Sequence, residues 1–212
     1  MERFLFRLSE SDYRDIFILK GALLLKVWKI SDSRATMDID TLARTSNSLD
    51  NIIKMIKDIC KLSPSVDDGV DFLVSSIKGE KMQLQNEYEG IRIKFEGRLG
   101  SAKIPMQIDI GFGDVITPHA EESQYPNLLN FPGPKLKTYP QETLLAEKIF
   151  TMVEKGETNS RIKDFYDVWL LFSYDLFSHD ILRLALERTF KSRNMKYDFK
   201  IVKSTVNLYL KN

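Results

Sequence analysis

Acidic side chains near residue 40 have the chemistry and spacing of a cation site. Asp38 and Asp40 stand two residues apart in the run Met37-Asp38-Ile39-Asp40-Thr41, where acidic residues alternate with others. A period of two is that of a strand, so both carboxylates leave one face, with Cα atoms roughly 6–7 Å apart. Magnesium is commonly held by one or two such carboxylates, with substrate phosphates completing its shell. The pair predicts a cation site, although an Asp-x-Asp pair that only solvates a turn has the same spacing.

A third acid, Asp109, lies in a second predicted strand, 104–110. The alternate residues of this strand are apolar: Met106, Ile108 and Ile110. Asp109 is therefore expected on the other face, where a carboxylate among apolar residues is unfavourable unless it is paired or bound to metal. A third acid facing the first two would complete a site for two cations that clamp a phosphoryl displacement. Two alternatives stay open: an ion pair of Asp109 with Arg98 or Lys103, and Asp114 in its place.

Lys148 lies on the apolar face of a helix predicted over 141–154, between Leu144 and Met152. A lysine on a buried face needs an anionic partner, and a nucleotide phosphate would supply one. The alternative is that its stem packs in the core while the ammonium reaches water.

The helix predicted over 160–174 is apolar almost all round and has a narrow polar strip of Lys163, Asp164 and Asp167. Such a helix is buried by its neighbours, so the strip lines a cleft or an internal ion-pair network. A local pair between Lys163 and Asp167 is the simpler interpretation.

Gly21 separates a strand predicted over 16–19 from a helix predicted over 22–28. Backbone amides at a helix start can hold a phosphate. A lone glycine turn is also common without any ligand.

Composition bounds these hypotheses. The 212 residues are 43% hydrophobic, enough for a sizeable core, and the net charge of +1 disfavours a protein that coats nucleic acid through bulk charge. With Cys60 as the single cysteine and only His119 and His179, a disulfide framework, a structural zinc site and a Cys-His nucleophile are poorly supplied. No apolar run spans a bilayer and no secretory signal is evident, so a cytoplasmic protein without a membrane partner is expected.

The segment from 188 to 211 is strongly basic, with Asp198 as its one acid. Aromatic residues are interleaved with these cations: Tyr197, Phe199 and Tyr209. The segment therefore either holds an RNA backbone and stacks bases or is a solvated helix face.

These elements predict an α/β fold with a mixed sheet and flanking helices over 1–117, followed by a helical lobe over 141–212. Strands are expected at 34–42, 70–77, 91–99 and 104–110, and helices at 3–8, 49–62, 181–191 and 201–210. The proline-rich stretch 118–140 is expected to lack regular structure and to connect the two lobes.

Five segments in this order resemble the AbiEii/AbiGii toxin family, a branch of the polymerase-β-like minimal nucleotidyltransferases. They are Phe17-Ile18-Leu19-Lys20-Gly21-Ala22-Leu23-Leu24, Arg34-Ala35-Thr36-Met37-Asp38-Ile39-Asp40, the stretch 104–114, Tyr139-Pro140-Gln141-Glu142-Thr143-Leu144-Leu145-Ala146-Glu147-Lys148, and Asn159-Ser160-Arg161-Ile162-Lys163-Asp164-Phe165-Tyr166-Asp167. The resemblance covers nearly the whole chain. One departure is at Gly21-Ala22, where the superfamily usually has Gly-Ser or Gly-Gly.

The resemblance implies Mg²⁺- or Mn²⁺-dependent transfer of a nucleoside monophosphate from an NTP to an acceptor. Asp38 and Asp40 would bind the cations, and Asp109 would complete the site and help to orient or deprotonate the acceptor hydroxyl. Lys148 would be the catalytic, nucleotide-contacting lysine. The other implied nucleotide-binding residues are Lys20, Gly21, Arg34, Thr36, Lys163, Asp164 and Asp167.

The resemblance also implies biological partners. The acceptor would be tRNA or another RNA, and the chain would be the toxin of a toxin-antitoxin system for phage defence by abortive infection, paired with a winged-helix antitoxin. Two other functions stay open: a catalytically degenerate scaffold that binds antitoxin or RNA, and a metal-dependent phosphohydrolase.

Overall fold

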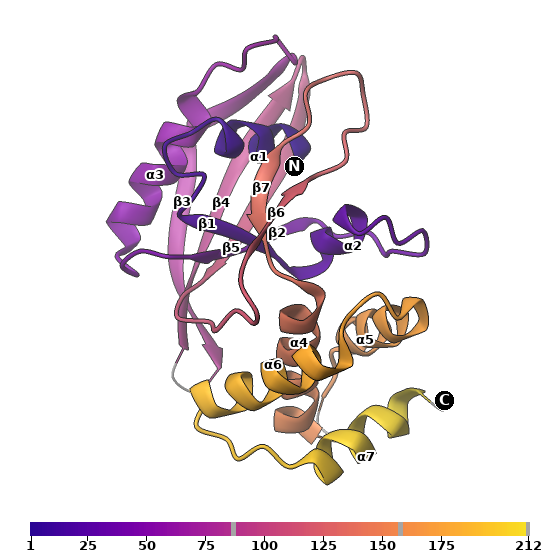
Figure 1. Ribbon diagram of the computed structural model, residues 1–212. Coiled ribbons are helices and arrows are strands. Elements are labelled where there is room, and N and C mark those ends of the chain that lie inside the picture. Colours follow the sequence, from indigo (N-terminus) through magenta and orange to yellow (C-terminus); the bar gives the residue numbers. More distant parts are fainter. Residues whose placement is uncertain (86–87, 157–158, 211–212) are drawn as a thin grey trace. The chain divides into compact units, whose positions relative to one another are not determined.

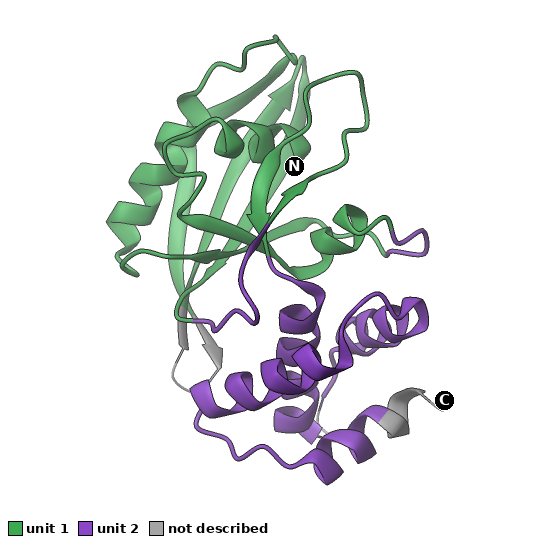
Figure 2. Ribbon diagram, in the orientation of Figure 1, with its two compact units in different colours: residues 1–29, 34–113, 122–138 green, residues 30–33, 114–121, 139–212 purple. Residues whose placement is uncertain are grey.

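The computed structural model describes residues 1–85, 88–156 and 159–210, which form two compact units (Figure 2). Unit 1 comprises residues 1–29, 34–113 and 122–138, and unit 2 comprises residues 30–33, 114–121 and 139–212. Neither unit is continuous in sequence, because the chain passes between them more than once.

Unit 1 is built on a seven-stranded mixed sheet in the order β3-β4-β5-β2-β1-β7-β6 (Figure 1). The strands are β1 (Phe17–Lys20), β2 (Asp38–Ala43), β3 (Val70–Gln85), β4 (Tyr88–Leu99), β5 (Ala102–Gly111), β6 (Glu121–Gln124) and β7 (Lys135–Thr138). β2 runs parallel to β5 and β1 to β7, whereas the pairs β1–β2, β3–β4 and β4–β5 are antiparallel. The predicted mixed α/β fold is confirmed.

Two helices, α1 (Glu2–Ser9) and α3 (Leu49–Lys61), cover one face of β3 and β4. The ring of Phe4 in α1 lies 5.4 Å from that of Phe95 in β4, and Gly79 of β3 lies under α3. Gly79 pairs with Ile93, two residues from Phe95, so both helices pack on the same face. This face holds the buried apolar residues Ile39, Ile91, Ile93, Phe95, Met106, Ile108 and Ile110. The predicted site acids must therefore leave the opposite face.

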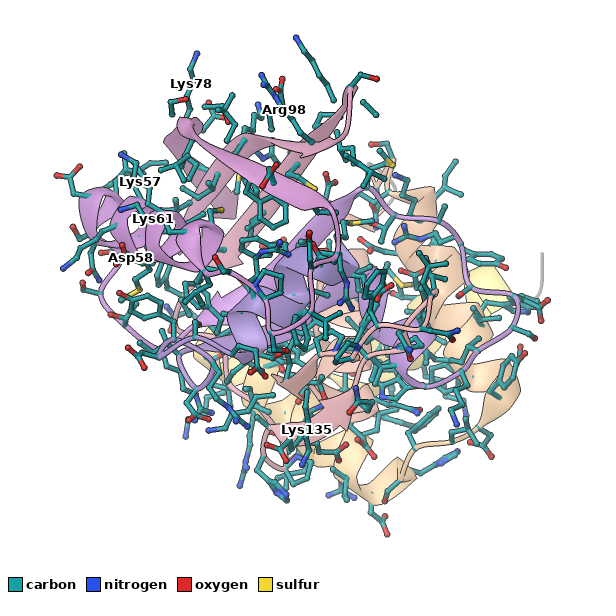
Figure 3. All side chains as sticks on the ribbon, turned by 90° about the horizontal axis from the view of Figure 1, so that it is seen from above. Lys57, Asp58, Lys61, Lys78, Arg98 and Lys135 are labelled. Atoms are coloured by element: carbon teal, nitrogen blue, oxygen red, sulfur yellow. The ribbon has the colours of Figure 1, made fainter. Side chains whose placement is uncertain are left out.

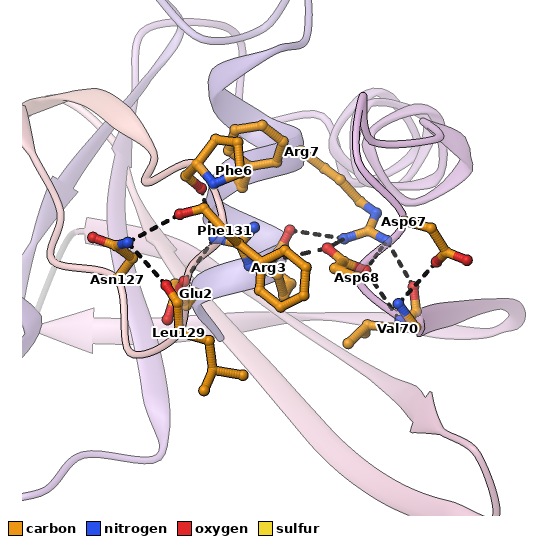
Figure 4. Close-up of polar contacts among 12 residues, drawn as sticks. Glu2, Arg3, Phe6, Arg7, Asp67, Asp68, Val70, Asn127, Leu129 and Phe131 are labelled. Atoms are coloured by element: carbon orange, nitrogen blue, oxygen red, sulfur yellow. Dashed lines mark hydrogen bonds and ion pairs between the residues drawn. The ribbon is translucent and has the colours of Figure 1, made fainter.

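Arg7 fixes α1 to the segment before β3 (Figure 4). Its guanidinium donates two hydrogen bonds to Asp68, at 2.9 and 3.0 Å, and others to the carbonyl oxygens of Leu62 and Val70. Arg7 is buried, and a buried charge is tolerated when it is paired in this way. Arg3 adds a contact over the ring of Phe131. The N-terminal helix is thus part of the unit 1 core.

α3 begins at the Ser48 cap, whose side chain accepts a hydrogen bond from the amide of Asn51. Its charged side carries Lys57, Asp58 and Lys61, which lie at the surface (Figure 3). This amphipathic arrangement confirms the predicted helix.

Unit 2 contains the remaining long helices: α4 (Gln141–Lys155), α5 (Ile162–Tyr174), α6 (His179–Ser192) and α7 (Phe199–Leu210). α4 is almost wholly buried from Glu142 to Met152 because it contacts the other three helices. Phe150 of α4 packs edge-on against Phe190 of α6, with ring centroids 5.1 Å apart. Across the described ranges, none of the helices has the length and apolar character needed to cross a membrane.

The chain path differs from expectation at three places. Stretch 118–140 does contain regular structure, because β6 and β7 lie between its prolines and leave no proline inside a strand. β2 begins only at Asp38, and Met37 before it is 70% exposed. The helix expected over 22–28 is a 3₁₀ turn, η1 (Gly21–Leu23), followed by the short α2 (Leu24–Val27).

Candidate active site

The predicted acidic residues lie on the sheet face opposite α1 and α3. Asp40 of β2 and Asp109 of β5 are register partners on adjacent parallel strands, and Asp38 is paired likewise with Gln107. Side chains in register leave the same face of a sheet, so the three carboxylates share one face of unit 1. All three acids are partly exposed, whereas Ile39 between the first two is fully buried.

The carboxylate of Asp40 lies against the backbone of Gly21. A Cβ placed on Gly21 would lie only 2.1 Å from Oδ2 of Asp40, and Gly21 has a φ of 72°. Both features require glycine. Lys20 is the register partner of Asp40 across β1 and β2, so its side chain belongs to the same face.

Thr36 and Arg34 precede β2. The Oγ1 of Thr36 accepts a hydrogen bond from the amide of Asp38 at 3.4 Å, which helps to fix the start of the strand. Arg34 is partly exposed. The nucleotide contacts of both residues stay predictions.

Asp109 is held by Arg92 of the neighbouring strand β4. Nε donates to Oδ1 at 2.7 Å and Nη2 donates to Oδ2 at 2.6 Å, a bidentate pair. Neither Arg98 nor Lys103, the partners named in the alternative interpretation of Asp109, fills this role. They face each other across the β4–β5 hairpin, because its turn at 100–101 sets the register. The same turn places Arg92 opposite Asp109. Pairing the residues of the two strands in order from this turn would therefore have predicted Arg92 as the partner.

The donor set suits a hard divalent cation. Asp38 and Asp40 offer carboxylate oxygens from one strand face, and magnesium is commonly held by one or two protein carboxylates. Within residues 1–85, 88–156 and 159–210, no three Asp, Glu, His or Cys side chains are grouped as ready-made metal ligands. The carboxylate of Asp109 is bound to Arg92 instead. A cation held by all three acids therefore requires Asp109 to leave Arg92.

Lys148 of α4 is the centre of a buried ion-pair cluster in unit 2. Its Nζ lies 2.7 Å from Asp164 Oδ1 and 2.8 Å from Asp167 Oδ2, both on α5. Arg161 adds a second cation at 2.9 Å from Asp164. The polar strip of α5 therefore forms the internal network that was one of its two predicted roles. Lys148 does not reach water as the snorkelling alternative required, and the acid expected to pair with Lys163 pairs with Lys148.

Asp114, the alternative to Asp109, belongs to a different network in unit 2. Its carboxylate accepts hydrogen bonds from the hydroxyl of Tyr139 at 3.0 Å and from Arg193 at 3.3 Å. Arg193 also lies 3.6 Å from Glu147. Burial, followed by the charges of Glu147 and Asp114, raises the pKa of Tyr139 well above its usual value. This network connects α4 with the end of α6.

The sequence matches the family described as "Nucleotidyl transferase AbiEii toxin, Type IV TA system" over residues 3–210. The chain belongs to the AbiEii family. It is accordingly a nucleotidyltransferase of a toxin family, and the resemblance found in its five motifs is confirmed. Comparison with curated proteins gave no match.

Solved structures share the AbiEii fold at low identity. MenT4, a nucleotidyltransferase toxin from Mycobacterium tuberculosis H37Rv, aligns with a TM-score of 0.60 and 13% identity over 98% of this chain and 79% of its own. JHP933 from Helicobacter pylori aligns with a TM-score of 0.51 and 13% identity over 99% of this chain and 88% of its own. At this identity the similarity establishes the nucleotidyltransferase fold alone.

Proposed function

We propose that this AbiEii protein transfers a nucleoside monophosphate from an NTP to an RNA acceptor, with release of pyrophosphate, and that Asp38, Asp40 and Asp109 form its cation site. The observation that carries the proposal is the register of β2 and β5, which brings Asp40 and Asp109 together on one face with Asp38 beside them. Convergent carboxylates on one sheet face are the ligand type that Mg²⁺ or Mn²⁺ requires.

Each acid has a distinct proposed role. Asp38 and Asp40 hold the divalent cation, which supplies charge neutralisation for the reacting phosphates when it is bound. Asp109 completes the site and orients or deprotonates the acceptor hydroxyl. Gly21 lets the Asp40 carboxylate approach the β1 turn, since any larger residue would occupy its place.

The nucleotide contacts are proposed from the family motifs. In unit 1 these residues are Lys20, Gly21, Arg34 and Thr36, and in unit 2 they are Lys148, Lys163, Asp164 and Asp167. The ammonium group of Lys148 already contacts two carboxylates, those of Asp164 and Asp167. A phosphate would contact Lys148 in one of two ways. It would replace Asp164 or Asp167, or it would accept a hydrogen bond from the third N–H of the ammonium group.

The RNA acceptor is supported by charge in the C-terminal segment. From residue 188 to residue 203, five cations are exposed: Arg188, Lys191, Lys196, Lys200 and Lys203. Phe199 is 61% exposed among them, as a base-stacking residue would be, while the side chain of Tyr209 lies outside the described residues. A cognate winged-helix antitoxin, a role in phage defence and a cytoplasmic location complete the proposal, in keeping with a toxin family.

The test is incubation with Mg²⁺, total cellular RNA and each α-labelled NTP in turn. We expect label to enter RNA, and Asp40→Asn to abolish labelling while the protein stays folded by circular dichroism. Asp71→Asn is the matched control, since Asp71 is an exposed acid on β3 of the same sheet and should leave labelling unchanged. Label found on free NDP or NMP and not on RNA would indicate a phosphohydrolase. No reaction with any NTP would favour the non-catalytic scaffold.

A further inference from the structure

Arg92 neutralises a carboxylate that the proposed function assigns to the cation. Its Nε and Nη2 engage both oxygens of Asp109, at 2.7 and 2.6 Å. The side chain of Asp109 is 17% exposed and that of Arg92 is 32% exposed. Both side chains thus keep some contact with solvent.

The surroundings of Arg92 are those of the acidic face. It is the register partner of Asp109 across β4–β5, so its side chain leaves the same face as the three site acids. The pKa of Arg92 is raised, first by its hydrogen bond to Asp109 and then by the charges of Asp109 and Asp38. The charge of Asp38, a second site acid, therefore also stabilises the Arg92 guanidinium.

We propose that Arg92 is the counter-ion of Asp109 in the unloaded protein and positions this carboxylate until a divalent cation displaces the guanidinium. This inference rests on the proposed function, because it needs Asp109 as a cation ligand. A bidentate guanidinium uses one lone pair of each Asp109 oxygen, and a cation chelated by both oxygens needs the same two lone pairs. A guanidinium carries one charge and a divalent cation carries two, so at equal distance the cation attracts the carboxylate more strongly.

After it leaves Asp109, the Arg92 guanidinium can bind a phosphate in the same site. Its planar guanidinium matches phosphate as well as carboxylate, with two parallel N–H donors. The side chain leaves the sheet on the face that carries Asp38, Asp40 and Lys20. Arg92 accordingly passes from Asp109 to a phosphate of the nucleotide, and its loss affects the cation and the nucleotide in opposite directions.

The experiment measures Mn²⁺ binding to the full chain without nucleotide, by calorimetry and by electron paramagnetic resonance. We expect Arg92→Gln to bind Mn²⁺ about fivefold more tightly. The substitution removes the Arg92–Asp109 ion pair, which is partly exposed and competes with Mn²⁺ for Asp109. In the presence of Mn²⁺, the same variant should bind NTP more weakly. Arg98→Gln is the matched control, since Arg98 lies on the same face of β4 but pairs with Glu96, and it should leave Mn²⁺ affinity unchanged.

A double-variant comparison separates a specific effect from a general change of charge. In an Asp109→Asn background, Arg92→Gln should no longer tighten Mn²⁺ binding. If Arg92→Gln binds Mn²⁺ as the wild type does, or tightens it equally without Asp109, then Arg92 is not the counter-ion. If Asp40→Asn leaves Mn²⁺ affinity unchanged, the cation site of the proposed function fails, which is a separate result.

Discussion

Oδ2 of Asp40 occupies the space in which a side chain at position 21 would begin, 2.1 Å from an ideal Cβ on Gly21. The turn after β1 and the second acid of β2 are therefore coupled. A change at Gly21 must move either the carboxylate or the backbone that supports it.

We expect Gly21→Ala to lower the free energy of unfolding by about 2 kcal/mol or more and to weaken Mn²⁺ binding, because it adds a collision to backbone strain. Gly100→Ala is the control. Gly100 also has a positive φ, 57°, but a Cβ there meets nothing within 4 Å. It should cost about 1 kcal/mol through strain alone and leave Mn²⁺ binding intact. Equal Mn²⁺ affinity in both variants would contradict the coupling of Gly21 with Asp40.

Lys148→Met should destabilise unit 2 by about 3 kcal/mol, because Asp164 and Asp167 would keep their buried charges without the ammonium that contacts both. Lys163→Met, an exposed change on α5, should alter stability by less than about 0.5 kcal/mol. Hydrogen exchange of α4 and α5 amides would report the difference locally. Similar protection in both variants would show that the cluster contributes little, and activity lost on changing Lys148 would then reflect a nucleotide contact.

Stability should fall with rising pH above about 10, where tyrosine ionises in the unfolded chain. Tyr139 is fully buried, and burial, then Glu147 and Asp114, raise its pKa, so the folded protein keeps a proton that the unfolded chain releases. Stability is therefore fully present below pH 10 and is lost as pH rises toward the folded pKa. Tyr139→Phe should reduce this alkaline loss in urea unfolding at a series of pH values. An unchanged pH slope would rule out Tyr139 as its source.

Cys60 should react with a disulfide reagent at least about 100-fold more slowly in the native protein than in urea at pH 8. Burial raises the pKa of its thiol to about 12, and the residue is 7% exposed although it borders a recess of about 290 Å³. Only the thiolate attacks disulfides, so both low ionisation and burial slow the reaction. Rapid native labelling would mean that α3 opens from the sheet.

Local periodicity predicted most of the fold and the placement of the acids. Alternation of apolar residues with Asp38, Asp40 and Asp109 put each acid on the solvent side of its strand, and the pairing of β2 with β5 brought Asp40 next to Asp109. Arg92 was missed because its partner depends on hairpin register, which is counted from a turn and not from neighbouring residues.

Contacts between residues far apart in the chain could not be predicted from the sequence. Asp167 lies four residues from Lys163, yet it pairs with Lys148 on another helix, because α4 and α5 bury their polar residues against each other. β7 is only four residues long in a proline-rich stretch, so its own pattern is weak. It becomes a strand through its pairing with β1, where Leu19 faces Thr138.

That late strand has a consequence for biosynthesis. β1 lies between β2 and β7 in the sheet, and β2 depends in turn on β5. A nascent chain that has not yet passed Thr138 would leave one edge of β1 without its neighbour. We therefore infer that a growing chain pairs β2 with β5 before it covers β1, and that the edge of β1 stays open to other strands until β7 follows.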